Sequence, residues 1–296
     1  MRAVVVNAFG GPENVEVVQA EVPEPGAREI RIKVAAAALN PVDAGVRAGV
    51  FGGAGKRIGL GWDVAGTVDA VGVATSWRVG DEVVALDYGM VKPLGTHADY
   101  VVVPTDAVAK APATVDAVHA ATLPLNALTA EQALDLLELT PGQSLLVTGA
   151  AGAVGAYAVQ LAARRGISVT GLAREGDEEF VRSLGAARFA AGAVDVAGFD
   201  AVLDAAVLGE PALAWVRDGG RYAGVIPQAQ PASVRGVWTG AVEVNPDGAR
   251  LAELVRLVDA GVLTTRVAET FALDEAAKAH ARLDEGGVRG RLVLVP

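Results

Sequence analysis

The most constraining stretch of this chain is residues 145–162, where a short apolar run passes through small residues into a helix-like pattern. Leu145–Thr148 predicts a buried strand, Gly149–Gly155 a tight turn, and Val154–Arg164 a helix. Such a turn presents backbone N–H groups and the positive end of a helix dipole, so it can hold a pyrophosphate. A strand–helix unit whose small residues serve packing alone is the alternative interpretation.

Two glycines of this turn have separate expected roles. Gly152 lets the backbone approach the phosphates, and Gly155 lets the helix pack against the strand. The spacing follows Gly-x-Gly-x-x-Gly, except that Ala150 stands in the place of the first glycine. The residues expected to bind the cofactor in this turn are Gly149, Ala150, Ala151, Gly152, Ala153, Val154 and Gly155.

The next predicted strand, Ile167–Leu172, leads to the position that reads the adenosine ribose in a dinucleotide-binding fold, about 20 residues beyond the glycines. An acidic residue there would accept a hydrogen bond from the 2′-hydroxyl of NAD. This chain has Ala173 and Arg174 instead, and a cation suits the 2′-phosphate of NADP. The alternative is a solvated arginine at a strand end, with its charge neutralised by Glu175.

Composition excludes several classes of function. The 296 residues are enough for about two domains with a large core. The net charge of −10, without a basic run, argues against nucleic acid and anionic membranes as partners. Cysteine is absent, so there is no disulfide and no thiolate nucleophile or metal ligand. No apolar stretch reaches about 18 residues, and the N-terminal apolar run is too short for a signal peptide, so we expect a cytoplasmic protein.

The pattern of predicted secondary structure changes twice along the chain. Turn signals in the first part, around strands such as Glu29–Val34 and Glu82–Leu86, predict a β-barrel or sandwich. Strands then alternate with helices, which predicts a parallel sheet covered on both faces. After the helical segment Ala249–Ala260, strands return at Arg266–Phe271 and Arg291–Val295. The expected domains are residues 1–115, 116–247 and 248–296, with the last rejoining the first.

Seven landmarks follow one another along nearly the whole chain: Asn40–Asp43, Gly61–Val68, Gly80–Val83, Gly95–Tyr100, Leu123–Ala130, the glycine turn and Gly286–Arg291. With this order and spacing, the sequence resembles the medium-chain dehydrogenase/reductases, in the zinc-free quinone oxidoreductase branch related to zeta-crystallin. The resemblance implies an α/β fold in which a Rossmann dinucleotide-binding domain is inserted in a GroES-like β-barrel catalytic domain. It places the active site between the two.

The same resemblance implies roles for individual residues. Asn40 and Thr129 would be catalytic, near the nicotinamide end of the cofactor, and Arg291 of the last landmark would bind the cofactor. Each candidate has a plainer alternative: Asn40 as a turn residue before a proline, and Thr129 as a helix-start residue. For Asp43 we prefer the plainer reading, a cap on the following helix.

Zinc is not expected. Zinc alcohol dehydrogenases of this superfamily have a Cys ligand where Asn40 stands and a His ligand where Trp62 stands, and the four-Cys structural lobe is missing. The three histidines, His97, His119 and His280, are far apart in the sequence.

Two further departures concern substrate and cofactor. Tyrosines found in several quinone reductases are replaced by Gly45 and Phe51, and Asp177 stands near the position of the family's phosphate-binding lysine. Tyr88 and His97 are possible proton donors, although packing or surface roles are the preferred reading for both.

The resemblance implies an NADPH-dependent, zinc-independent oxidoreductase that reduces a quinone or an α,β-unsaturated carbonyl compound by hydride transfer. The alternative is an NADPH-binding sensor or structural protein without significant turnover. The expected partners are a small-molecule quinone or enone and a second copy of the chain, with no nucleic acid and no membrane. Family members commonly dimerise through an edge strand of the Rossmann sheet, for which Ala241–Val244 is the candidate here.

Overall fold

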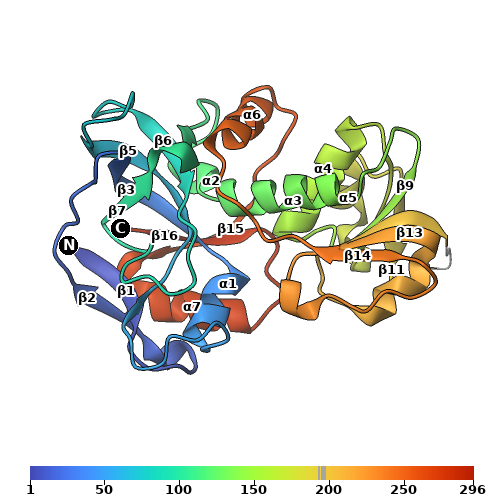
Figure 1. Cartoon of the computed structure of the whole chain (residues 1–296), viewed down its shortest axis with the longest axis horizontal. Helices are drawn as coiled ribbons and strands as arrows, with labels where there is room; N and C mark the ends of the chain where they lie inside the picture. The colour runs from blue at the N-terminus through green and yellow to red at the C-terminus, as the bar shows by residue number, and fades with distance from the viewer. Residues whose placement is uncertain (193, 195–197) are drawn as a thin grey trace. The chain divides into compact units, whose positions relative to one another are not determined.

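The computed structural model describes residues 1–192, 194 and 198–296, which divide into two compact units (Figure 1). Unit 1 comprises Met1–Leu125 and Asn245–Pro296, and unit 2 comprises Asn126–Val244. The first boundary therefore falls about ten residues later than the expected 115/116. The reason is the short helix α2 (Ala117–Ala120), which packs against strands of unit 1.

Unit 1 contains two sheets and four helices among its described residues. The smaller sheet has the order β2 (Val15–Gln19), β1 (Arg2–Val6), β4 (Ile58–Gly59). The larger has the order β15 (Val267–Ala272), β16 (Arg291–Val295), β3 (Glu29–Leu39), β5 (Asp63–Val71), β6 (Glu82–Leu86), β8 (Val108–Lys110), and β7 (Tyr100–Pro104) also pairs with β3. The helices are α1 (Pro41–Arg47), α2, α6 (Gly248–Asp259) and α7 (Ala276–Asp284).

Strand β3 lies inside the larger sheet, where it pairs with β5, β7 and β16, and its first residues alternate between buried and more exposed side chains. Ile30, Ile32 and Val34 are buried in one cluster with apolar side chains of β5, β6 and β7. Beyond the residues that pair with β7, Glu29–Lys33, β3 pairs antiparallel with β16, at Leu39↔Leu292. The blue strand β3 and the red strand β16 thus belong to one sheet (Figure 1), which confirms the expected return of the chain to the barrel.

Unit 2 is built on one parallel sheet with the order β11 (Arg188–Ala191), β10 (Ser168–Ala173), β9 (Ser144–Thr148), β12 (Phe199–Asp204), β13 (Val216–Gly224), β14 (Trp238–Ala241). In chain order this is 3-2-1-4-5-6, the arrangement of a Rossmann sheet. Its helices are α4 (Ala153–Arg164), α5 (Glu178–Ser183) and most of α3 (Pro124–Leu136).

Two elements begin earlier than their sequence patterns predict. The sequence pattern predicts a helix over Leu128–Glu138, whereas α3 starts at Pro124, because proline fits the first helical position, where its missing N–H costs nothing. The sheet ends in β14 at Trp238–Ala241, so the expected edge segment Ala241–Val244 shares only its first residue with that strand. The edge is a strand of Trp, Thr, Gly and Ala rather than the apolar run that was expected.

Candidate cofactor and active site

The glycine turn of unit 2 has the predicted strand–turn–helix form. Strand β9 ends at Thr148 and helix α4 begins at Ala153, with Gly152 as its N-cap. The helical ladder starts where the Ala156 N–H donates to the Gly152 carbonyl at 2.9 Å. The N–H groups of the first turn before Ala156 have no acceptor one turn back, so they are available to an anion, which the helix dipole also favours.

The two glycines of the turn differ in their surroundings. Beyond its chain neighbours, a Cβ on Gly152 would meet one described atom within 4 Å, the Gly149 carbonyl oxygen at 3.1 Å, and the rest of the space around it is open. A Cβ on Gly155 would clash with the Gly149 carbonyl oxygen and lie 2.7 Å from the Gly149 carbonyl carbon and 3.0 Å from the Ala150 Cα. Gly155 therefore lets α4 pack against the backbone of the turn itself, and not against the strand as the sequence predicts. The open space at Gly152 fits a cradle for phosphate.

Arg174 directly follows the carboxyl end of β10, the strand beside β9, and its side chain is exposed. The suggested ion pair with Glu175 is not formed, and Arg174 has no ion pair with any described residue. Asp177 is buried nearby, and its N–H donates to the Arg174 carbonyl at 2.9 Å. The guanidinium is thus left exposed at the position that reads the ribose in Rossmann folds.

A buried polar network lies at the carboxyl ends of β9, β12 and β13. The Thr148 hydroxyl donates to Asp204 Oδ1 at 2.5 Å, and the Tyr222 hydroxyl donates to Asp204 Oδ2 at 2.8 Å. All three side chains are fully buried. Sequence reasoning missed this network, although an Asp directly after the apolar residues of a predicted strand was a signal that could have pointed to it.

In unit 1, the side chain of Asn40 forms a hydrogen bond with a buried carboxyl group. Asn40 Nδ2 donates to Asp63 Oδ2 at 2.6 Å, and the Leu125 N–H donates to Asp63 Oδ1 at 2.6 Å. Burial raises the pKa of Asp63 to about 7, against the opposing effect of these two hydrogen bonds and of the Arg291 charge. Arg291 therefore acts on Asp63, a partner that sequence reasoning missed.

Asp43 caps helix α1, as the preferred reading predicted. Its Oδ2 accepts from the Asn40 N–H and its Oδ1 accepts from the Gly61 N–H, both at 2.8 Å. Asn40 is the N-cap residue and Pro41 takes the first helical turn, so the turn interpretation of Asn40 also holds. The catalytic role of Asn40 stays a prediction.

Thr129 is buried in α3, five residues after the helix begins at Pro124. The alternative of a helix-start residue is therefore wrong, because that position belongs to the proline. Its role near nicotinamide stays a prediction, as does cofactor binding by Arg291.

The two possible proton donors are both packed. His97 is fully buried with Nε2 3.0 Å from the Ala38 carbonyl, and burial lowers the pKa of its imidazole. The Tyr88 ring packs edge-on against Trp62, with centroids 5.0 Å apart. These contacts support the packing interpretation of both residues.

The two positions that lack the family's tyrosines contact each other. The Phe51 ring lies 2.9 Å from where a Gly45 Cβ would stand. Neither residue offers a hydroxyl. In the part of the chain that the structure describes, no three His, Cys, Asp or Glu side chains form a group that could hold a metal ion. Among the same residues, no helix is long and apolar enough to cross a membrane.

Comparison with known proteins gives consistent matches. Residues 26–113 match the family model "Alcohol dehydrogenase GroES-like domain", and residues 175–294 match "Zinc-binding dehydrogenase". The chain is 32% identical to an Arabidopsis thaliana NADPH-dependent alkenal/one oxidoreductase, covering 100% of this chain and 80% of the relative. It is 30% identical to a Pseudomonas aeruginosa quinone oxidoreductase, covering 98% of both chains.

Among solved structures, the quinone oxidoreductase of Coxiella burnetii superposes with a TM-score of 0.87 at 27% identity, covering 100% of this chain and 99% of that one. A Rossmann sheet joined to a GroES-like barrel defines an oxidoreductase that uses a nicotinamide cofactor. The chain belongs to the medium-chain dehydrogenase/reductase superfamily, in its quinone oxidoreductase branch.

Proposed function

We propose that this protein is an NADPH-dependent, zinc-independent reductase of quinones or of alkenes conjugated to a carbonyl group. The observation that carries the proposal is the open glycine turn of unit 2, with an exposed and unneutralised Arg174 after the neighbouring strand. Relatives named quinone oxidoreductase and NADPH-dependent alkenal/one oxidoreductase support the substrate class and the cofactor.

In this proposal, the residues of unit 2 bind and orient the cofactor. The N–H groups of Ala153, Val154 and Gly155 hold the pyrophosphate, and Arg174 forms a charge-assisted contact with the 2′-phosphate. For Asn40, Thr129 and Arg291 we keep the roles that the family resemblance implies. When bound, the cofactor supplies the hydride, and the protein supplies position and electrostatics.

Hydride transfer leaves negative charge on an oxygen of the substrate, which must meet hydrogen-bond donors or water. Gly45 and Phe51 offer no hydroxyl, and His97 already contacts the Ala38 carbonyl in a buried position. A reduced quinone stabilises its own negative charge and has less need of a dedicated acid. These residues therefore favour a quinone over an enone as substrate.

The second candidate, an NADPH-binding sensor or structural protein, is favoured by the same missing hydroxyls. Both candidates are tested by titrating NADPH into the protein and then following NADPH absorbance across a panel of quinones and enones. We expect saturable binding and oxidation with at least one quinone. Binding without oxidation across the panel would favour the sensor, and failure to bind NADPH would refute both.

A further inference from the structure

Strands β9 and β12 are joined by two similar pairs of side chains, one at each end. At the amino ends Ser144 pairs with Asp200, and at the carboxyl ends Thr148 pairs with Asp204. Both pairs consist of a hydroxyl that donates to a carboxyl group across two neighbouring parallel strands. The shared chemistry makes each pair a control for the other.

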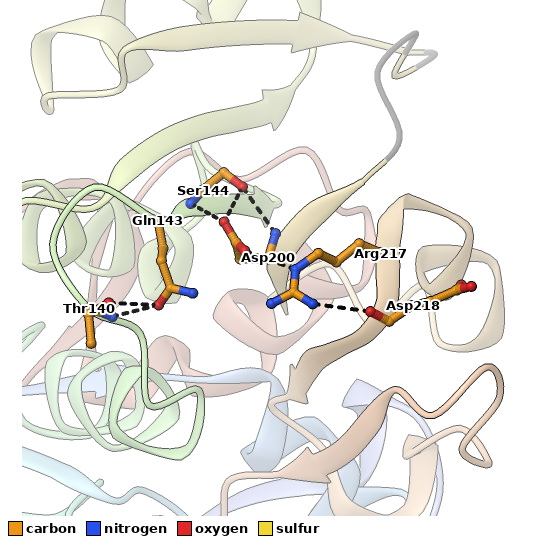
Figure 2. Close-up of polar contacts among 6 residues, drawn as sticks. All are labelled: Thr140, Gln143, Ser144, Asp200, Arg217 and Asp218. Carbon is orange, nitrogen blue, oxygen red and sulfur yellow. Dashed lines mark hydrogen bonds and ion pairs between the residues drawn. The ribbon is translucent and has the colours of Figure 1, made fainter.

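The amino-end pair is a local cluster (Figure 2). Asp200 Oδ2 accepts from the N–H and the hydroxyl of Ser144, each at 2.8 Å, and Oδ1 accepts from Arg217 Nε at 2.9 Å. The Ser144 hydroxyl also accepts from the Asp200 N–H at 3.0 Å. This cluster lies at the end of the strands away from the glycine turn, so its contacts stabilise the sheet alone.

The carboxyl-end pair extends into the loop that follows β12, residues 205–209. The Ala206 N–H donates to the Thr148 hydroxyl at 3.0 Å, and the Gly209 N–H donates to Asp204 Oδ2 at 2.8 Å. Two hydrogen bonds therefore hold the loop in place. The hydroxyl of Tyr222, a residue of β13, donates to the same Asp204 carboxyl group.

Between Ala206 and Gly209, the backbone of Val207 has a φ of +57°. A β-branched residue rarely adopts this left-handed conformation, and it persists only where the surrounding contacts impose it. The loop also touches the glycine turn, because a Cβ on Gly149 would lie 3.2 Å from the Ala206 nitrogen. The buried network thus sets the conformation of a loop that packs against the phosphate-binding turn.

The position of the network in the sheet suggests its purpose. Strand β9 is followed by β10 on one side and flanked by β12 on the other, so the strand order reverses between β9 and β12. In open α/β sheets, ligands bind outside the carboxyl ends of the strands at this switch point. The Thr148–Asp204 hydrogen bond spans that point, and the amino-end pair does not.

We propose that Thr148, Asp204 and Tyr222 form a positioning network for the dinucleotide site, holding loop 205–209 against the glycine turn before the cofactor arrives. This inference rests on the proposed function, because it assigns the network to NADPH binding. None of the three side chains contacts the cofactor, since all are buried. Their effect is pre-organisation: a loop already held in place need not be ordered when the cofactor binds.

The test compares Thr148→Val, which has nearly the same shape without the hydroxyl, with Thr148→Ser, which keeps it. Ser144→Ala is the control at the other end of β9. We expect Thr148→Val to raise the Kd for NADPH about tenfold, the effect of losing one to two hydrogen bonds. Thr148→Ser should restore most of the affinity. Ser144→Ala should lower the melting temperature and leave the Kd unchanged.

Hydrogen exchange adds a readout that does not depend on the cofactor. In Thr148→Val the amides of Ala206 and Gly209 should exchange faster, while those of Ser144 and Asp200 should not. Tyr222→Phe is the milder second variant, should Thr148→Val fail to fold, and it should raise the Kd in the same direction.

The outcomes separate the two proposals. If the wild-type protein binds NADPH and Thr148→Val binds it equally well at the same temperature, the positioning role is wrong and the proposed function stands. Equal losses of affinity in Ser144→Ala and Thr148→Val would also overturn the positioning role, because the effect would then be general instability. If the wild type does not bind NADPH, the proposed function fails, and the assignment of this network to the cofactor fails with it.

Discussion

Substitution of the two glycines that flank the first turn of α4 separates cofactor binding from packing. Gly155→Ala places a methyl group 2.7 Å from the Gly149 carbonyl carbon and 3.0 Å from the Ala150 Cα. Both are backbone atoms, which cannot rotate away as a side chain would. Gly152→Ala meets one backbone atom, the Gly149 carbonyl oxygen, at 3.1 Å, which a shift of a few tenths of an ångström would relieve, and its φ of −76° suits any residue.

The expected magnitudes follow from these distances. Overpacking against atoms that cannot yield typically costs 1–3 kcal/mol. In a protein of roughly this size, 1 kcal/mol changes the melting temperature by about 2–4 °C, so Gly155→Ala should melt about 2–12 °C lower. Gly152→Ala should melt within about 2 °C of the wild type. Its methyl group, however, enters the open space assigned to the pyrophosphate, so we expect markedly weaker NADPH binding, and no binding for Gly152→Val.

The assay is a thermal melt of each variant and a fluorescence titration with NADPH at a temperature where all are folded. Two results would refute the reasoning. Normal NADPH affinity in Gly152→Val would mean that the turn holds no phosphate. A wild-type melting temperature for Gly155→Ala would mean that α4 does not pack on the turn as closely as described.

Four further predictions concern other parts of the molecule. Arg174→Ala should abolish a preference for NADPH over NADH of about 10–100-fold, measured as a ratio of dissociation constants; an unchanged ratio would exclude Arg174 from 2′-phosphate binding. Activity should survive prolonged chelation, and stoichiometric zinc by elemental analysis with loss of activity on its removal would contradict this. The hydrogen bonds from Ser144 and the Arg217 charge lower the pKa of Asp200 from 3.8 to about 2, so its contribution to stability is present above pH 4 and lost as the pH falls toward 2. Between pH 4 and pH 2, the melting temperature of the wild type should therefore fall more than that of Asp200→Asn. Equal falls in the two proteins would refute the stabilising role of the Asp200 carboxylate. Finally, we expect a homodimer that pairs through the edge strand β14. Light scattering should give the mass of two chains, whereas a stable monomer at micromolar concentration would count against the dimer.

The parts of the fold that were predicted correctly depend on local patterns. Within residues 145–164, the strand has an apolar run, the turn has its glycines and the helix has its periodicity, all inside a short window. Their form could therefore be predicted without tertiary information. The start of α3 was missed although a local signal existed, namely Pro124 at the first helical position.

The residues that sequence reasoning missed have partners far away in the chain. Asp63 binds Asn40, 23 residues away, and the Leu125 N–H, 62 residues away. Asp204 binds Thr148, 56 residues away. No pattern within a short window pairs such groups, because only the sheet registers and the helix start bring them together. A carboxyl group at the end of an apolar run showed at most that some partner was needed.

The discontinuity of unit 1 has a consequence for how the chain is made. Strand β3 is complete once residue 39 has been synthesised, but one of its neighbours, β16, consists of residues 291–295. Unit 2 is continuous, so every strand of its sheet is available while the end of β3 that pairs with β16, Ala37–Leu39, is still unpaired. During synthesis, the inserted unit can therefore fold first, whereas Ala37–Leu39 of β3 must wait for residues 291–295 to complete their pairing. Ribosome-stalled chains lacking β16 should expose that end of β3 to chaperones or to aggregation while already containing a folded nucleotide-binding sheet.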